Sequence, residues 1–242
     1  MNPGVGRLIR KLETFATLAE TDKRALAETV TTVRRFSAHE DLLREGEPFD
    51  ELKLILEGLA CRYKLLPDGR RQIVAYLVPG DLCDIRTFIL KRMDHSICSL
   101  APVEAALLSA EGVLGLMGRS PALTRALWWS TLVEEANARE WLVNVGHRTA
   151  FERLAHLLCE IFIRLRAVGL TQDNRCDLPL TQNELADTLA LSLVHVNRML
   201  MEMRRAGLVT FQNKQLTIHD LQALQSASGF NASYLHLDGD KH

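Results

Sequence analysis

Apolar positions from Leu180 to Leu208 recur every three or four residues with a single interruption, a pattern that predicts two short helices. The first helix begins with Thr181 and Glu184 at the spacing of a capping box, which satisfies free backbone N–H groups at a helix start. A sharp turn follows, and Ser192 is a good N-cap for the second helix. Two short helices joined by a tight turn form a helix-turn-helix, whose second helix usually enters the major groove of DNA.

The second helix and the segment after it strengthen this interpretation. The helix ends at Gly207, a residue suited to the left-handed conformation beyond a helix end. Its predicted buried side chains are Val196, Met199, Leu200 and Met203. Two short strands, 208–211 and 216–218, then surround the polar turn 212–214, and this hairpin makes the unit a winged helix.

Charge along this segment favours a nucleic-acid partner. From position 192 to 219 there is one acid, Glu202, and four basic residues: Arg198, Arg204, Arg205 and Lys214. A local basic excess of this kind is what phosphate neutralisation needs. The alternative is a helical hairpin whose solvated basic face serves only packing or protein contacts.

The segment from residue 32 to 108 has a different pattern, with short β-rich runs separated by turns. Pro67-Asp68-Gly69 between two alternating runs predicts a hairpin. Glycines recur about every 11 residues, at Gly46, Gly58, Gly69 and Gly80. This spacing predicts an antiparallel sandwich or barrel. Two helices should precede it, one over 8–18 and one capped by Thr21 or Asp22 that runs to about residue 30.

A long helix should follow the β-rich segment, with Ser120 as cap, Pro121 at its first position and its end near Val145. At 1.5 Å per residue it would be about 37 Å long. Its residues at steps of three and four form a coiled-coil-like stripe that we predict to form a parallel homodimer. These residues are Leu123, Leu127, Ser130, Glu134, Ala138, Trp141 and Val145. A second apolar surface comprises Trp128, Leu132, Ala136 and Val143, and burial of the helix within one chain is the alternative.

The remaining pattern completes the domain plan. Gly146 should break the long helix and act as a hinge, and an amphipathic helix should span 150–167, followed by a polar loop over 169–177. Asp220 should cap a last helix reaching about residue 226, and the tail from Gly229 should fray. We predict an α+β protein with a β-domain (1–115), a dimerisation helix (116–146), a winged helix-turn-helix (147–228) and a tail (229–242).

Composition excludes several classes. The formal net charge of −1 shows that any DNA affinity must come from a small face of the protein. No apolar run approaches the roughly 20 residues that cross a bilayer, and the charged N-terminus is not a secretory signal. The five cysteines include no CxxC, which favours a reduced cytoplasmic protein. HExxH, GxSxG and phosphate-loop patterns are absent, so an enzyme has almost no support.

In this order of elements the chain resembles the Crp–Fnr family of bacterial transcription regulators, over about residues 20–226. The most specific segments are TQNELADTLALSLVHVNRMLMEMRRAGL, REGEPFDELKLILEGLACRYKL and VPGDLCD. The resemblance implies a cyclic-nucleotide-binding-like jelly roll, a homodimer on a palindromic promoter site, contact with RNA polymerase and an effector that alters DNA affinity.

The resemblance also assigns roles to residues of the second helix. Arg198 falls on the family's base-contacting arginine, which can bind guanine O6 and N7. His195 and Asn197 lie beside it, and Val194 replaces a glutamate that reads cytosine in much of the family. Ser192, Arg204, Arg205 and Lys214 are the predicted backbone contacts. Leu193 stands where the cAMP-responsive members have arginine, so the half-site sequence does not carry over.

The ligand positions of the cAMP-binding members correspond to Ile85 and His95, so the acid for the ribose and the arginine for the phosphate are both missing. Arg86, Lys91 and Arg92 are nearby but out of register. No cysteine precedes Cys61, which argues against the family's iron–sulfur branch. Cys83 and Cys98 could approach one another, and haem ligation by His39, His95 or His147 lacks a motif.

We therefore predict a DNA-binding transcription regulator that acts as a homodimer, with no cofactor or metal and an unidentified effector. The alternative is a ligand-sensing dimer that regulates a protein partner rather than DNA.

Overall fold

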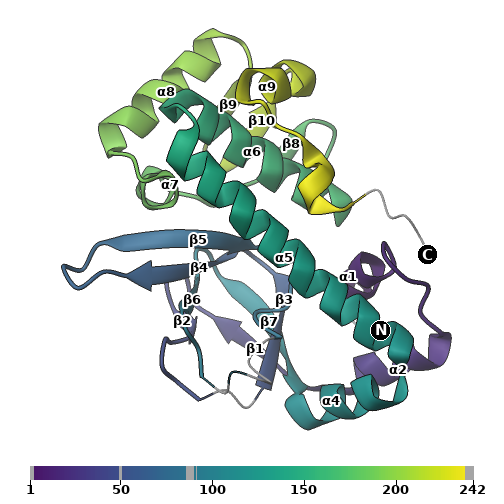
Figure 1. Cartoon of the computed structure of the whole chain (residues 1–242). Helices are drawn as coiled ribbons and strands as arrows, with labels where there is room; N and C mark the ends of the chain where they lie inside the picture. The colour runs from purple at the N-terminus through teal and green to yellow at the C-terminus, as the bar shows by residue number, and fades with distance from the viewer. Residues whose placement is uncertain (1–2, 49–50, 86–89, 91, 238–242) are drawn as a thin grey trace. The chain divides into compact units, whose positions relative to one another are not determined.

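The structure, a computed structural model, describes residues 3–48, 51–85, 90 and 92–237 (Figure 1). The chain forms two compact units, one of residues 1–63, 76–135 and 236–242, and one of residues 64–75 and 136–235. Within the described residues, no helix combines the length and apolar character needed to cross a membrane.

Two antiparallel sheets make up the β-domain, which confirms the predicted sandwich. One has the order β1-β7-β3 and the other β2-β6-β4-β5. The strands are β1 (Val30–Phe36), β2 (Asp41–Leu43), β3 (Glu51–Glu57), β4 (Ala60–Leu65), β5 (Arg71–Leu77), β6 (Ser96–Ser99) and β7 (Val103–Ser109). The predicted hairpin turn joins β4 to β5, where Leu66 N donates to Arg70 O at 2.8 Å and Gly69 has a φ of +84°.

Both N-terminal helices begin and end earlier in the chain than the sequence predicts. Helix α1 spans Pro3–Leu12 and α2 spans Glu20–Glu28, with Ala19 at the N-cap position instead of Thr21 or Asp22. Phe15 and Leu18 follow the end of α1 and pack on the same apolar core as the helix. The apolar spacing therefore continues beyond the last helical residue. That core also contains Leu52 and Leu54 of β3.

Two helices follow β7 without a long connection. Helix α4 (Ala110–Arg119) begins at the Ser109 cap and crosses the predicted domain boundary at residue 115. Helix α5 spans Pro121–His147, so the prediction that Gly146 breaks it is wrong. A glycine costs a helix only about 1 kcal/mol. The chain turns instead at Thr149, whose capping box with Glu152 starts α6 (Ala150–Ala167).

The second unit contains the predicted winged helix-turn-helix. It comprises α6, α7 (Gln182–Leu189), α8 (Leu193–Arg205), α9 (Leu221–Ser228) and a sheet of order β8-β10-β9. Its strands are β8 (Arg175–Asp177), β9 (Val209–Gln212) and β10 (Gln215–Ile218). Strand β8 lies in the segment predicted as loop, because three residues that pair with β10 are too short to show an alternating pattern.

The chain after Gly229 remains packed as far as Leu235. Phe230 and Leu235 are buried, and a short 3₁₀ helix spans Ala232–Leu235. Tyr234 Oη donates to the buried carboxylate of Glu160 at 2.9 Å. The prediction of a frayed tail is therefore wrong up to Leu235, since Phe230 and Tyr234 pack on His156 of α6.

Candidate nucleic-acid interface

The turn between α7 and α8 is as tight as predicted. Ala190 ends α7 in the left-handed conformation (φ 52°, ψ 44°), and Leu191 N donates to Ala186 O at 3.2 Å. Ser192 then caps α8 by accepting from His195 N at 3.3 Å. The left-handed conformation costs a non-glycine residue about 1–2 kcal/mol, and here it reverses the chain within two residues.

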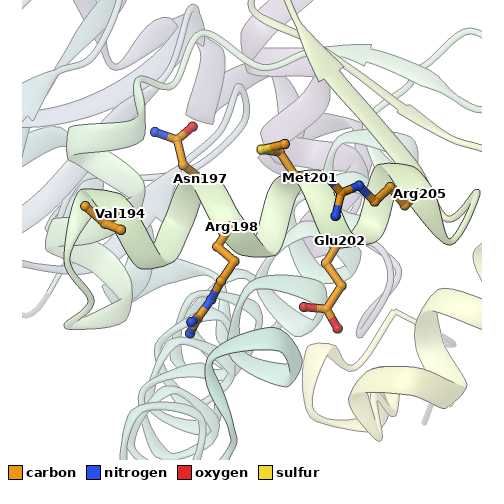
Figure 2. Close-up of a pocket in the computed structure, with 6 residues that line it drawn as sticks. All are labelled: Val194, Asn197, Arg198, Met201, Glu202 and Arg205. Atoms are coloured by element: carbon orange, nitrogen blue, oxygen red, sulfur yellow. The ribbon is translucent and has the colours of Figure 1, made fainter.

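Helix α8 has one buried and one exposed face. Val196, Met199 and Met203 are buried, as predicted, and Leu200 is half-buried. The exposed face lines a shallow groove of about 630 Å³ (Figure 2). The lining residues are Val194, Asn197, Arg198, Met201, Glu202 and Arg205. In Figure 2 Arg198 and Glu202 point to one side of the helix, and Asn197 and Met201 point to the other.

Three of the four predicted base-reading residues, Val194, Asn197 and Arg198, meet in this groove. His195 lies at the helix start, where its Nδ1 is 2.9 Å from Ser192 Oγ. Met201 and Glu202 also line the groove, although the sequence did not predict them as site residues. The missing signal was the spacing i, i+3, i+4, i+7, i+8 and i+11 from Val194, which is complementary to the buried face.

The predicted phosphate contacts lie on α8 and on the wing, and one of them, Arg205, also lines the groove. Arg204 and Arg205 are exposed at the end of α8, and Lys214 is exposed at the turn of the wing. Asn213 (φ 52°) and Lys214 (φ 60°) are both left-handed, as in the type I′ turns that suit a tight hairpin. These three side chains and that of Arg198 form no ion pair with any described residue. Their charges are free to meet an anionic backbone.

The apolar face of helix α5 that is exposed lies opposite to the face that was predicted to form the dimer. Leu123 and Leu127 are buried in the core of the β-domain. Glu134 is paired with Arg62, and Trp141 is buried, with its Nε1 donating to Glu160 at 2.9 Å. Thus most of the predicted dimer stripe faces its own chain, although Ala138 is exposed and Val145 is half-buried. The large exposed apolar side chains of α5 are Trp128, Leu132, Leu142 and Val143.

A buried arginine occupies the interior of the β-domain. Arg62 Nη2 donates to Cys83 O at 2.7 Å and to Glu134 Oε1 at 3.0 Å. Burial alone would lower the pKa of Arg62, but the charges of Glu134 and Asp84 outweigh it and raise that pKa. Arg62 therefore keeps its charge and links β4 to α5.

The two positions that correspond to the cyclic-nucleotide ligands are neither acidic nor permanently cationic. Ile85 packs against the apolar core, and His95 Nδ1 lies 2.6 Å from Asp94 Oδ1. Burial, and then the charge of Arg62, lowers the pKa of His95. His95 is therefore neutral at pH 7 and offers a phosphate no fixed charge. Arg92 binds Gly46 O at 2.9 Å, and Arg86 and Lys91 lie outside the described residues.

The same segment has limited capacity for a metal ion. Asp84, Asp94 and His95 form a group of described residues whose ligand atoms lie within 4.8 Å of one another. The charge of Arg62 acts on both Asp84 and His95 and opposes a cation there. Cys98 lies against Cys61 instead of Cys83, and Cys83 belongs to an apolar core cluster.

A β-sandwich, a long helix and a winged helix-turn-helix with a basic exposed face together define a DNA-binding regulator with a sensor-like domain. Residues 152–227 match the Crp-like helix-turn-helix domain, and residues 33–120 match the cyclic nucleotide-binding domain. The chain belongs to the Crp–Fnr family of transcription regulators.

Relatives and a solved structure agree with this assignment. The chain is 30% identical over 176 residues to the transcriptional activatory protein AadR of Rhodopseudomonas palustris, with 72% of each chain covered. It is 29% identical over 202 residues to the transcriptional activator protein FnrL of Cereibacter sphaeroides, covering 82% of this chain and 81% of FnrL. The structure of FixK2 from Bradyrhizobium japonicum matches with a TM-score of 0.73 and 26% identity, covering 81% of this chain and 96% of FixK2.

Proposed function

We propose that this protein binds an inverted-repeat promoter site as a homodimer and regulates transcription through contact with RNA polymerase. The observation that carries the proposal is the exposed groove face of α8, where Arg198 stands between Val194 and Glu202. AadR and FnrL are named as transcriptional activators, which supports contact with the polymerase. On this proposal the protein works in the cytoplasm, where bacterial DNA lies, and catalyses no reaction.

Base reading is assigned to four residues that line the groove, and phosphate binding to residues at the two ends of α8 and on the wing. Arg198 can bind guanine through two hydrogen bonds, and Asn197 can do the same with adenine. Val194, which is 77% exposed, can contact a thymine methyl group. Glu202 can accept from the amino group of cytosine. His195 is placed at the edge of this surface, and Ser192, Arg204, Arg205 and Lys214 are assigned to phosphates.

The homodimer is assigned to the exposed side of α5. Trp128 and Leu132 are each 54% exposed, and Leu142 is 74% exposed. Leu142 follows Trp128 by two heptads, so the two lie near the same helix face. Full burial of a large apolar side chain contributes about 1.5–3 kcal/mol, which makes a second copy of this helix a favourable partner. Gly146, inside α5 at its exposed end, remains our proposed hinge.

We further propose that cAMP is not the effector, because Ile85 and His95 supply neither ribose nor phosphate contacts.

The alternative function is a sensor that regulates a protein partner. Selection of duplexes from random DNA by the full-length protein separates the two. Our proposal predicts enrichment of an inverted repeat with half-site centres about 10–10.5 base pairs apart. Recovery of no common sequence, with only salt-sensitive general binding, would contradict it.

A further inference from the structure

Two cysteines face one another across neighbouring strands of the β-domain. Cys61 on β4 is the register partner of Cys98 on β6, and their sulfur atoms are 3.5 Å apart. Both cysteines are reduced thiols, with residue exposures of 0% for Cys61 and 4% for Cys98. Disulfides require Cα atoms about 4.4–6.8 Å apart, and directly paired antiparallel residues have Cα atoms about 4.5–5.5 Å apart. The backbone is therefore already spaced for a bond.

We propose that Cys61 and Cys98 are a redox modification site that forms a reversible intrachain disulfide. The sulfur atoms must approach by roughly 1.5 Å to reach the bonding distance of about 2.05 Å. Rotation of the two side chains and a small adjustment of one strand can supply this movement. No sequence motif marks the pair, because 37 residues separate the cysteines and only the sheet register brings them together.

Hydrogen peroxide is the oxidant we assign, because it is small enough to reach the slightly exposed Cys98. The Cys98 thiolate attacks one peroxide oxygen and the O–O bond breaks, which gives a sulfenic acid and hydroxide. The Cys61 sulfur then attacks the Cys98 sulfur, and the S–O bond breaks as water leaves. In sum two thiols and one peroxide give one disulfide and two waters, with sulfur oxidised and oxygen reduced. A dithiol reductant reverses the modification.

The position of the pair gives the disulfide a route to α5. Cys61 directly precedes Arg62, whose guanidinium donates to Glu134 on α5 at 3.0 Å. Movement of β4 toward β6 at Cys61 therefore shifts Arg62, and with it the hydrogen bond from Arg62 to Glu134 of α5. All three tryptophans, Trp128, Trp129 and Trp141, lie on α5, so intrinsic tryptophan fluorescence reports on this helix alone.

Thiol counting of the full-length protein tests the site without any DNA. Titration in denaturant should find five thiols per reduced chain. After peroxide treatment it should find three, since five minus two is three, and five again after reduction. Peptide mapping without reductant should recover the peptides of Cys61 and Cys98 as one linked species. Cys61→Ser should abolish that species, and the matched control Cys159→Ser should retain it. Five thiols after treatment, or linkage of any other pair, would overturn the proposal.

Fluorescence tests the link to α5. Wild-type protein should change its tryptophan emission on oxidation and recover it on reduction. Cys61→Ser treated with the same peroxide should not change, which controls for oxidation of the indoles themselves. An identical change in Cys61→Ser, or no change in wild type with the disulfide formed, would overturn the link between β4 and α5.

Discussion

Arg62 and Glu134 join the β-domain to the long helix, with Arg62 Nη2 donating to Glu134 Oε1 at 3.0 Å. The Arg62 side chain is 8% exposed and that of Glu134 is 25% exposed. The sequence predicted no role for Arg62, and it placed Glu134 in the stripe of residues expected to form the dimer. The pairing explains why a carboxylate stands in that stripe.

The pair should contribute to stability mainly because a lone Arg62 would leave a charge buried. Breaking a fully buried pair costs about 3–5 kcal/mol, and the partial exposure of Glu134 reduces this to about 2 kcal/mol for Glu134→Gln. In an Arg62→Met background the same Glu134→Gln change should cost less than about 1 kcal/mol. Urea unfolding of the wild type, the two single variants and the double variant measures this cycle. Equal costs in both backgrounds would show that the two residues are not coupled.

Substitutions on the two faces of α5 should have different consequences. Leu132→Glu places a charge on the exposed face and should give a monomer at micromolar concentration, where wild type should sediment at twice 27.2 kDa. Leu127→Glu buries an unpaired charge in the core and should lower the free energy of unfolding by several kcal/mol, on the order of 4. Sedimentation and thermal unfolding measure both effects. A Leu132→Glu protein that remains dimeric would place the interface elsewhere.

Acid should destabilise the second unit through His156. Burial, together with the charge of Arg148, lowers the pKa of His156 to about 4, although Glu140 acts in the opposite direction. Between pH 6.5 and 4, His156 therefore binds a proton in the unfolded chain but remains neutral in the folded chain. The free energy of unfolding should fall with decreasing pH in this window, by at most about 1.4 kcal/mol per pH unit from this group.

His156→Gln is the variant that isolates this effect. It removes the titrating ring, which packs on Phe230 and Tyr234, while His95, whose pKa is also lowered, stays in place. The variant should be less stable at pH 7 but show a shallower decline toward pH 4. Urea unfolding at several pH values measures the slope. An unchanged slope would mean that His156 does not govern the acid response.

Calorimetric titration checks the assignment of the β-domain. Addition of cAMP up to millimolar concentration should release no saturable heat, since His95 is neutral and Arg62 is committed to Glu134 and to Cys83 O. The binding competence of each preparation is controlled by titration with the selected duplex. Saturable binding of cAMP that is lost on changing Arg92 or His95 would contradict the assignment.

The sequence predicts those elements whose signals are local. The capping box at Thr181, the Ser192 cap and the end of α8 near Gly207 depend on neighbouring residues, and the structure shows these three helix boundaries close to the predicted positions. In contrast, both faces of α5 are apolar, so the spacing alone could not decide whether Leu127 or Leu132 faces the chain. The Cys61–Cys98 contact was also hidden, because strand pairing at long range determines it.

In the function proposed above, α8 reads bases while the wing binds phosphates. Binding of three proteins to two duplexes tests this division most directly. Wild type, Arg198→Ala and Lys214→Ala are titrated into the selected inverted repeat and into a scrambled duplex at several salt concentrations. Arg198→Ala should lose about 1–3 kcal/mol on the selected site and much less on the scrambled one. Lys214→Ala should weaken both duplexes alike and reduce the slope of log affinity against log salt by about one unit per half-site. If Arg198→Ala weakened both duplexes equally, Arg198 would be a phosphate contact and the proposed orientation of α8 in the groove would be wrong.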